Sequence, residues 1–290
     1  MTAPIEADFV VVGGGSAGCV VAARLSEDPS TQVVLLEAGR NWRSAEAPIQ
    51  VRSMNGWRAL DETLPEYQWI GLESRRTRSQ GPRPHVRGKG LGGSSVVNGM
   101  IAIHSMADDY DRWAAFGCPG WSFDDVLPYR RRMETDLNFA EEPYHGGDGP
   151  IPVLRLPREQ WGPADNALAQ AAAELGHGWC DDHNAPAGTG LSPYGISARG
   201  GARVTTNDGY LEPARERQNL RVIGGAMVDN VLIERGCAAG VRARIGDEWV
   251  EVRASTVVLC AGAIHSPSIL LRSGVGPDGS VARLPSVCRT

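Results

Sequence analysis

The sequence lacks the features that mark membrane, secreted and nucleic-acid-binding proteins. No apolar run approaches the roughly 18 residues that a membrane-spanning helix needs, and the acidic segment 2–8 does not resemble a secretory signal. The formal net charge of −5 argues against duplex nucleic acid as a partner, because such binding usually requires a basic surface. We therefore expect a cytoplasmic protein without a membrane span or a nucleic-acid partner.

The sequence also lacks clear spacing patterns for disulfides and for metal ligands. None of the six cysteines shares a C-x-x-C spacing with another, and without a secretory signal their even number is no evidence for disulfides. The most compact set of ligand types is His177, Cys180 and His183. Gly178 and Trp179, which lie between His177 and Cys180, favour a loop, whereas ligands at this spacing would have to share one face of a helix. The sequence therefore predicts no metal site.

Glycine is abundant, at 36 of 290 residues, and its first cluster lies inside a clear structural pattern. Residues 8–12 are nearly all apolar, as in a buried parallel strand. A helix is expected over 16–27, where small and apolar residues recur at helical spacing, and Asp28-Pro29 ends it. A second apolar strand is expected over 32–36. The segment predicts one βαβ unit.

The turn between the first strand and the helix carries the motif G-x-G-x-x-G, formed by Gly13, Gly15 and Gly18. Gly13 permits the tight turn, Gly15 lets the backbone approach a pyrophosphate, and Gly18 lets helix and strand pack closely. The start of the helix, with Ser16 and Ala17, then faces the phosphates with free N–H groups. In this context the motif predicts a dinucleotide site.

Glu37 ends the second strand and is followed by Ala38. An acidic residue at this place can accept hydrogen bonds from both ribose hydroxyls of an adenosine, which disfavours NADP but leaves NAD and FAD open. Residues 14–18 also match G-x-S-x-G, the nucleophile elbow of α/β-hydrolases. We set that reading aside, because no earlier loop could supply the second oxyanion donor and Glu37 would have no role.

The rest of the chain alternates between helical and extended patterns. Helices are expected over 163–176 and, in two pieces separated at Cys118–Gly120, over 108–134. Strands are expected at 151–154 and, as an antiparallel arrangement, at 220–223, 227–233, 240–245 and 249–252. A separate buried strand is expected at 255–260, with a helix from Ser266 onward.

Two longer motifs decide between the cofactors. Gly88–Asn98 resembles the first signature of the glucose–methanol–choline (GMC) oxidoreductases, and Gly262–Gly276 resembles the second at every defined position. Tyr144–Pro150 and Gly209–Ala214 look like landmarks of the same family in the right order. The resemblance covers about residues 5–279, which is almost the whole chain.

The resemblance implies FAD as the cofactor and an α/β fold. A Rossmann-type FAD-binding domain would be formed by 5–107 and 203–280. An incomplete α+β substrate domain would be inserted at 108–202, and 281–290 would be a truncated tail.

The resemblance also assigns cofactor contacts. In the second glycine turn, Gly88, Gly92, Gly93 and Ser94 would wrap the pyrophosphate. The next residues, Asn98, Gly99 and Met100, would lie against the flavin ring. Val228 would contact the adenine through the backbone of its strand, and Ala261 and Gly262 would end another strand beside the nucleotide. Family members with covalent flavin carry a histidine where this chain has Val97, so non-covalent FAD is expected.

The family's reaction is alcohol oxidation, in which a histidine base takes the hydroxyl proton while hydride passes to flavin N5. That histidine and its partner belong to a carboxy-terminal half that we do not find in this sequence, so no catalytic residue is expected within it. Cys288 stands where relatives continue with glycine, and we expect the chain to be cut within a domain. His104 is a poor candidate for a surrogate base, and His265 is interpreted as a structural histidine.

Three functions stay open at this point. The first is an FAD-dependent alcohol dehydrogenase or oxidase, similar to choline dehydrogenase, acting on a small-molecule alcohol. The second is a non-catalytic flavin-binding remnant, or a subunit that needs a carboxy-terminal partner or forms a homo-oligomer. The third is an NAD-dependent enzyme built on the same Rossmann unit.

Overall fold

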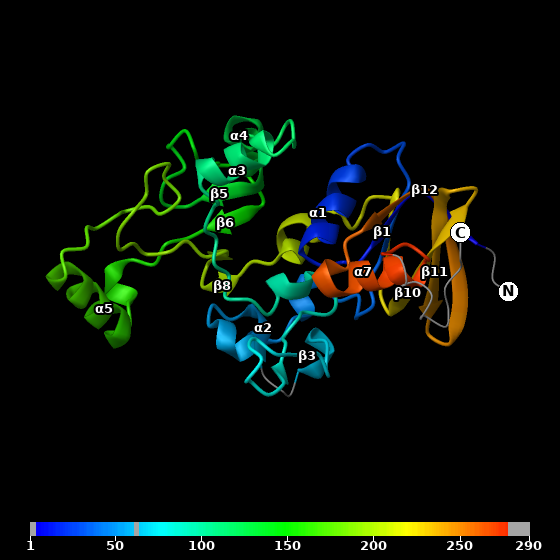
Figure 1. The fold of residues 1–290 in the computed structure, drawn as a ribbon, viewed down its shortest axis with the longest axis horizontal. Helices are drawn as coiled ribbons and strands as arrows, with labels where there is room; N and C mark the ends of the chain where they lie inside the picture. The colour runs from blue at the N-terminus through cyan, green and yellow to red at the C-terminus, as the bar shows by residue number, and fades with distance from the viewer. Residues whose placement is uncertain (1–3, 61–63, 278–290) are drawn as a thin grey trace. The chain divides into compact units, whose positions relative to one another are not determined.

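The computed structural model describes residues 4–60 and 64–277, which form two compact units (Figure 1). The first contains the described residues up to Asn98 and from Thr205 onward, and the second is Gly99–Val204. The sequence had placed the first boundary after residue 107. The structure places it earlier because Ala102 N donates to Gly195 O at 2.8 Å, which ties this segment to the second unit.

The first unit contains the longer strands and two of the main helices. Its elements are β1 (Ile5–Val12), α1 (Ser16–Leu25), β2 (Val33–Leu36), η1 (Ser44–Glu46), α2 (Ile49–Arg52), η2 (Gly56–Leu60), η3 (Pro65–Tyr67), β3 (Glu73–Ser74), β4 (Arg83–Pro84), η4 (Gly93–Ser95), η6 (Asn207–Leu211), α6 (Glu212–Ala214), β9 (Leu220–Ile223), β10 (Ala226–Glu234), β11 (Cys237–Ile245), β12 (Glu248–Leu259) and α7 (Gly262–Arg272).

A six-stranded sheet in the order β10-β11-β12-β1-β2-β9 forms the centre of this unit. β1 pairs in parallel with β12 and with β2, and β2 pairs in parallel with β9. β10, β11 and β12 pair antiparallel. The expected βαβ unit is confirmed, and it lies in the parallel part of a mixed sheet.

Two of the expected strand arrangements are wrong. The strand at 220–223 is not antiparallel, because β9 pairs in parallel with β2 at the edge of the sheet. The two strands expected at 249–252 and 255–260 are one continuous strand, β12. Val252 lies in both ladders of that strand, opposite Val241 of β11 and Ile5 of β1, so one long strand joins the antiparallel and parallel parts.

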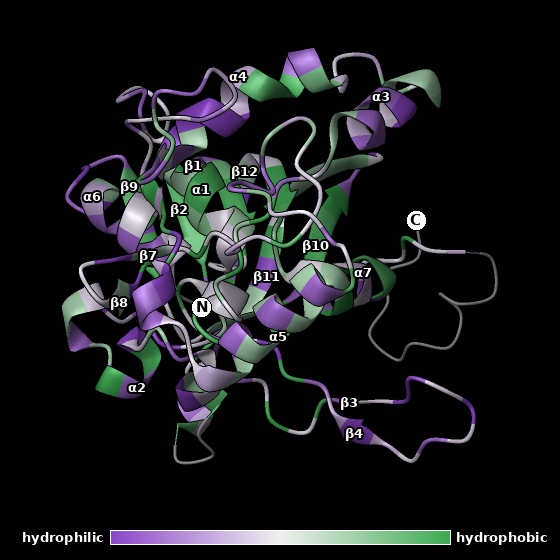
Figure 2. Cartoon of the chain, turned by 90° about the vertical axis from the view of Figure 1, so that its left-hand side faces the viewer, coloured by the Kyte–Doolittle hydropathy of each residue, from purple (hydrophilic) through white to green (hydrophobic). Residues whose placement is uncertain are grey.

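The parallel strands β1 and β2 consist largely of hydrophobic residues, which Figure 2 colours green. Val10 and Val12 of β1 and Val34 of β2 belong to one buried cluster, which Ile269 of α7 completes. Successive side chains of a strand point to opposite faces. Val11 is fully buried and faces the other side, where α1 packs on β1 and β2. Burial on both faces is typical of parallel sheets.

The second unit has short strands and three main helices among its described elements. They are α3 (Ala107–Ala115), α4 (Phe123–Met133), β5 (Glu134–Asp136), β6 (Ile151–Val153), η5 (Arg158–Gln160), α5 (Pro163–Glu174), β7 (Ala198–Arg199) and β8 (Ala202–Arg203).

Local signals set the helix ends in this unit, as expected. Gly120, in the predicted break between α3 and α4, has a φ of 82°. Ser122 and Asp125 then form a capping box at the start of α4, with Ser122 N donating to the Asp125 carboxylate at 3.1 Å. α5 begins at Pro163 and is followed by Gly176 in the left-handed region, with a φ of 81°.

The architecture is α/β, as the sequence predicted, with a Rossmann-type arrangement around β1. Over residues 4–60 and 64–277, the structure has no helix of the length and apolar character that a bilayer crossing requires.

Candidate nucleotide-binding site

The first glycine turn joins β1 to α1 through close backbone contacts. Gly13 has a φ of 97°, and a Cβ on it would lie 2.7 Å from the carbonyl oxygen of Cys260. A Cβ on Gly18 would lie 1.8 Å from Gly13 O. Both positions therefore require glycine, and α1 starts directly against the end of the parallel strands.

The second glycine turn packs on the first. Gly93 has a φ of 50°, and a Cβ on it would lie 2.6 Å from the Cα of Gly15. Gly92 N donates to Gly14 O at 2.8 Å, and a Cβ on Gly88 would lie 2.0 Å from Gly93 O. Two glycine-rich segments that are far apart in the sequence are thus packed backbone to backbone.

Glu37 links the two turns. Its Oε2 accepts a hydrogen bond from Gly14 N at 2.7 Å, and its Oε1 accepts from Gly39 N at 2.7 Å and from Gly90 N at 2.9 Å. The carboxylate is almost fully buried. A carboxylate has about four acceptor sites, so the three amides leave capacity for a further donor.

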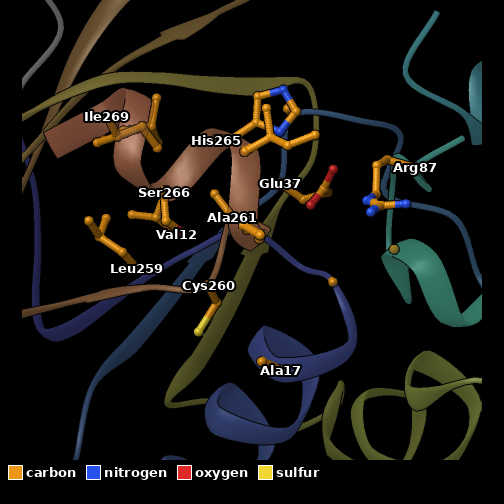
Figure 3. Close-up of a pocket in the computed structure, with 18 of the residues that line it drawn as sticks. Val12, Ala17, Glu37, Arg87, Leu259, Cys260, Ala261, His265, Ser266 and Ile269 are labelled. Atoms are coloured by element: carbon orange, nitrogen blue, oxygen red, sulfur yellow. The ribbon is translucent and has the colours of Figure 1, made fainter. Parts of the chain in front are cut away.

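A hollow of about 600 Å³ lies beside these turns (Figure 3). α1 begins at its edge, with Gly15 as N-cap and no side chain capping the free N–H groups of the first turn. A helix start of this kind attracts anions. The predicted site residues that line the hollow are Gly13, Gly15, Ser16, Ala17, Glu37, Ala38, Gly88, Gly93, Ser94, Val228, Ala261 and Gly262.

Other predicted residues lie elsewhere. Gly18 and Gly92 are among the packed backbone behind the surface rather than among the lining residues. Asn98 is exposed at the end of the first unit. Gly99 and Met100 belong to the second unit, where Met100 is buried and has a φ of 62°.

Several lining residues were not predicted from the sequence. Trp69 and Arg87 come from the irregular stretch before the second glycine turn, and Cys260 directly follows β12. His265 lies in the first turns of α7, inside the second family signature. The signal for His265 and Arg87 was their position within or directly before a cofactor motif, whereas nothing local indicated Trp69.

The thiols near the site are poor nucleophiles. Burial raises the pKa of Cys19 to about 12, and burial also raises the pKa of Cys260. Both side chains therefore act as small apolar groups at neutral pH.

Comparison with known proteins identifies the family and the fold. A family model of the GMC oxidoreductases matches residues 7–287. The chain belongs to the GMC oxidoreductase family. The members of this family are FAD-binding flavoproteins, so the sequence-based assignment of the family and of its cofactor is confirmed.

Relatives of this GMC chain include oxidases and dehydrogenases. It is 40% identical to an uncharacterized GMC-type oxidoreductase of Rhodococcus erythropolis over 97% of this chain and 56% of the relative. It is 38% identical to an oxygen-dependent choline dehydrogenase of Pseudomonas fluorescens over 94% of this chain and 48% of that enzyme. The crystal structure of pyridoxine 4-oxidase from Mesorbium loti matches with a TM-score of 0.87 and 32% identity, covering 97% of this chain and 54% of the oxidase. The chain thus spans about half the length of these relatives.

The GMC chain's hollow fits an adenine dinucleotide. A Cβ on Gly15 would meet only Gly93 Cα at 3.9 Å and Cys260 O at 4.0 Å, and a Cβ on Gly262 would meet nothing within 4 Å. Space next to uncapped helix N–H groups and a buried carboxylate suits a pyrophosphate joined to a ribose.

The second unit of the GMC chain holds a buried cluster of charges around His145. Its Nδ1 lies 2.8 Å from Glu134 Oε1 and 3.3 Å from Asp136 Oδ2, and its Nε2 lies 2.8 Å from Asp182 Oδ2. Arg155 bridges Asp136 and Asp182 at 2.8 and 2.6 Å. All five residues are buried.

Protonation in this cluster follows from its geometry. Burial alone would lower the pKa of His145, but hydrogen bonds with Asp182 and Glu134 raise it to about 9. Burial would raise the pKa of Glu134, but hydrogen bonds with His104 and His145 lower it to about 2. At neutral pH, His145 is therefore an imidazolium surrounded by carboxylates.

The same geometry argues against a metal ion or a catalytic base here. In the described part of the chain, His104, Glu134 and His145 form the group whose possible ligand atoms lie within 4.8 Å of one another. Both ring nitrogens of His145 face carboxylates. In His104, Nε2 lies 2.9 Å from Glu134 Oε2 and Nδ1 faces the Arg130 guanidinium. A metal ligand or a base needs a free lone pair on the ring. The group is an ion-pair network.

The other metal-ligand types considered from the sequence have separate partners. Cys180 Sγ donates to Asp182 O at 3.2 Å, and His183 Nε2 lies 2.7 Å from Gly190 O. His177 is exposed, follows α5 in the chain and lines a different hollow. The structure does not place these three side chains in the close group of potential ligands found among the described residues.

Proposed function

We propose that this chain forms the FAD-binding part of an oxidoreductase that oxidises the CH–OH group of a small alcohol. The observation that supports this most strongly is the pair of glycine turns joined through Glu37 beside an open hollow. Relatives that include a choline dehydrogenase and pyridoxine 4-oxidase support an alcohol-like substrate.

The residues of the hollow have complementary binding roles in this proposal. The N–H groups at Ser16 and Ala17 bind the pyrophosphate, with the partial positive charge of the α1 N-terminus behind them. Glu37 accepts a ribose hydroxyl through its remaining acceptor capacity. Val228, whose carbonyl oxygen already accepts from Arg272 Nη2 at 3.3 Å, borders the adenine. FAD, when bound, supplies the hydride acceptor.

Binding of FAD is proposed to be non-covalent. Val97 stands where a flavin-linking histidine would be expected, and its side chain is a hydrocarbon that is 7% exposed. It has no atom that could attack a flavin.

The proposed reaction also needs a base, and two histidines of the second unit are not free to serve as one. His104 and His145 are held in the ion-pair network. We propose that the base and the remaining walls of the substrate cavity come from a carboxy-terminal part comparable to the rest of the relatives' length, which this chain does not span. The truncated tail expected at 281–290 lies outside the described residues.

The test is an absorbance spectrum of the purified chain, before and after acid precipitation. Flavin bands that move to the supernatant would support non-covalent FAD, and colour that stays in the pellet would contradict it. Bound flavin that no alcohol reduces would favour a flavin-binding subunit without its own activity. A colourless chain that ignores FAD but is stabilised by NAD would overturn the proposal in favour of a nicotinamide enzyme.

A further inference from the structure

A hairpin in the first unit has no role in the proposed function. It consists of β3 and β4, which pair antiparallel with Ser74 opposite Arg83, and of the loop that joins them. Figure 2 shows this loop extending away from the two strands, largely in the purple of hydrophilic residues. A Cβ on Gly81, within the loop, would meet no atom within 4 Å. We call residues 71–86 the basic hairpin.

The charge of the basic hairpin is opposite in sign to that of the whole chain. The hairpin has four arginines and one glutamate, and so a net charge of +3, whereas the chain has a formal net charge of −5. Like charges this close together repel one another, and an anionic surface that neutralises them is attracted to the segment. The four arginines are all exposed, at Arg75, Arg76, Arg78 and Arg83.

The protein itself does not neutralise these arginines. Within residues 4–60 and 64–277, none of the four forms an ion pair, whereas Arg43 of the same unit lies 2.7 Å from Glu216. None of the four lines the hollow of the nucleotide site. Recognition of one particular carboxylate or phosphate relies on an oriented, bidentate pair. Guanidinium groups without such fixed partners are instead suited to the diffuse field of many anions.

Large apolar side chains are exposed near the base of the basic hairpin. Ile70, which directly precedes the hairpin, is 72% exposed, and Trp57 of η2 is 82% exposed. Gln68 Nε2 donates to Ala59 O at 3.4 Å, which links the segment of Trp57 to the strand that leads into the hairpin. Basic residues beside exposed tryptophan and isoleucine are typical of proteins that lie on an anionic membrane surface.

We propose that the basic hairpin, together with Trp57 and Ile70, forms a peripheral docking surface for membranes that contain anionic lipids. The arginines face the lipid phosphates, and the two apolar side chains enter the headgroup region. A membrane is favoured over an acidic protein, because the field of many headgroups requires no oriented partner for any one arginine. The inference does not depend on the cofactor or on the substrate, so it can fail while the proposed function stands.

The experiment measures co-sedimentation of the purified full chain with lipid vesicles at low salt. The vesicles contain either phosphatidylcholine alone or equal amounts of phosphatidylcholine and phosphatidylglycerol. We expect binding to the mixed vesicles only. We expect that binding to disappear at about 1 M salt, where screening limits the reach of charges to about 3 Å. The triple variant Arg75→Gln, Arg76→Gln and Arg78→Gln should bind the mixed vesicles about a hundredfold more weakly.

A second triple variant is the matched control, because it removes the same amount of charge from other exposed positions. Its changes are Arg158→Gln, Arg221→Gln and Arg244→Gln, and it should bind the mixed vesicles as the parent does. Trp57→Ser tests the apolar contribution and should weaken binding by about tenfold. All these side chains are exposed, so urea unfolding should give the parent's midpoint for every variant.

Several results would overturn the inference. The first is a parent chain that ignores the mixed vesicles or binds both kinds equally well. Equal loss in the two triple variants would mean that net charge acts rather than the basic hairpin. A chain that ignores vesicles but binds immobilised polyglutamate through the same arginines would have an acidic protein as its partner. None of these results bears on flavin binding, which the absorbance spectrum tests separately.

Discussion

Glu37→Gln tests whether the nucleotide site is assembled before any cofactor arrives. The carboxylate accepts from three backbone amides, at Gly14, Gly39 and Gly90, within a buried environment. Glutamine has the same shape but only one acceptor oxygen. If that oxygen faces Gly39 and Gly90, the side-chain NH₂ must face the N–H of Gly14, and one bond is replaced by two opposed donors.

The size of the effect follows from these three bonds. Hydrogen bonds to a charged group contribute about 1.5–3 kcal/mol each, against about 1 kcal/mol for neutral ones. One bond is lost and two become neutral, while some desolvation cost is relieved. We expect the cofactor-free chain to lose about 3 kcal/mol of unfolding free energy, and the amide of Gly90 to lose protection from hydrogen exchange.

Urea unfolding followed by tryptophan fluorescence, with hydrogen exchange of the Gly90 amide, measures both quantities without cofactor. Glu66→Gln alters an exposed glutamate and is the control. A Glu37→Gln chain as stable as the control, with unchanged protection at Gly90, would refute the reasoning. In that case the carboxylate would serve the ribose alone.

Two further predictions concern the hollow and the buried charges. Gly15→Val should leave the fold intact, since the Cβ meets no atom closer than 3.9 Å, but its branches should enter the hollow and abolish FAD uptake in a spectroscopic titration; uptake at the parent level would exclude this surface as the binding site. For His145, the folded pKa of about 9 lies above the ordinary 6.5, so its stabilising contribution is complete below pH 6.5 and is lost as the pH rises through about 9. That loss should be on the order of 3 kcal/mol in urea unfolding and should be absent in His145→Gln; equal midpoints at both ends of this range in the parent would contradict it.

Much of the fold could be predicted because local sequence patterns indicate where its strands and helices lie. The apolar run before Gly13 and the helical spacing after it predicted β1 and α1 within a few residues. The failures concern strand partners. Nothing in residues 220–223 says that they pair in parallel with β2, since the same alternating residues fit either direction. Likewise, β12 is one strand because β11 and β1 hold its two halves, which no local signal encodes.

The candidate site divides in the same way. The sequence by itself determined the glycine turns, the acidic end of β2 and the family, because each needs particular residues at particular spacings. Only the tertiary structure decided that Glu37 joins the two glycine turns. Its hydrogen bond with Gly90 spans 53 residues of the chain. It alone brought Trp69 against His265 and buried His145 among carboxylates. These contacts depend on distance in space, which the order of residues along the chain does not specify.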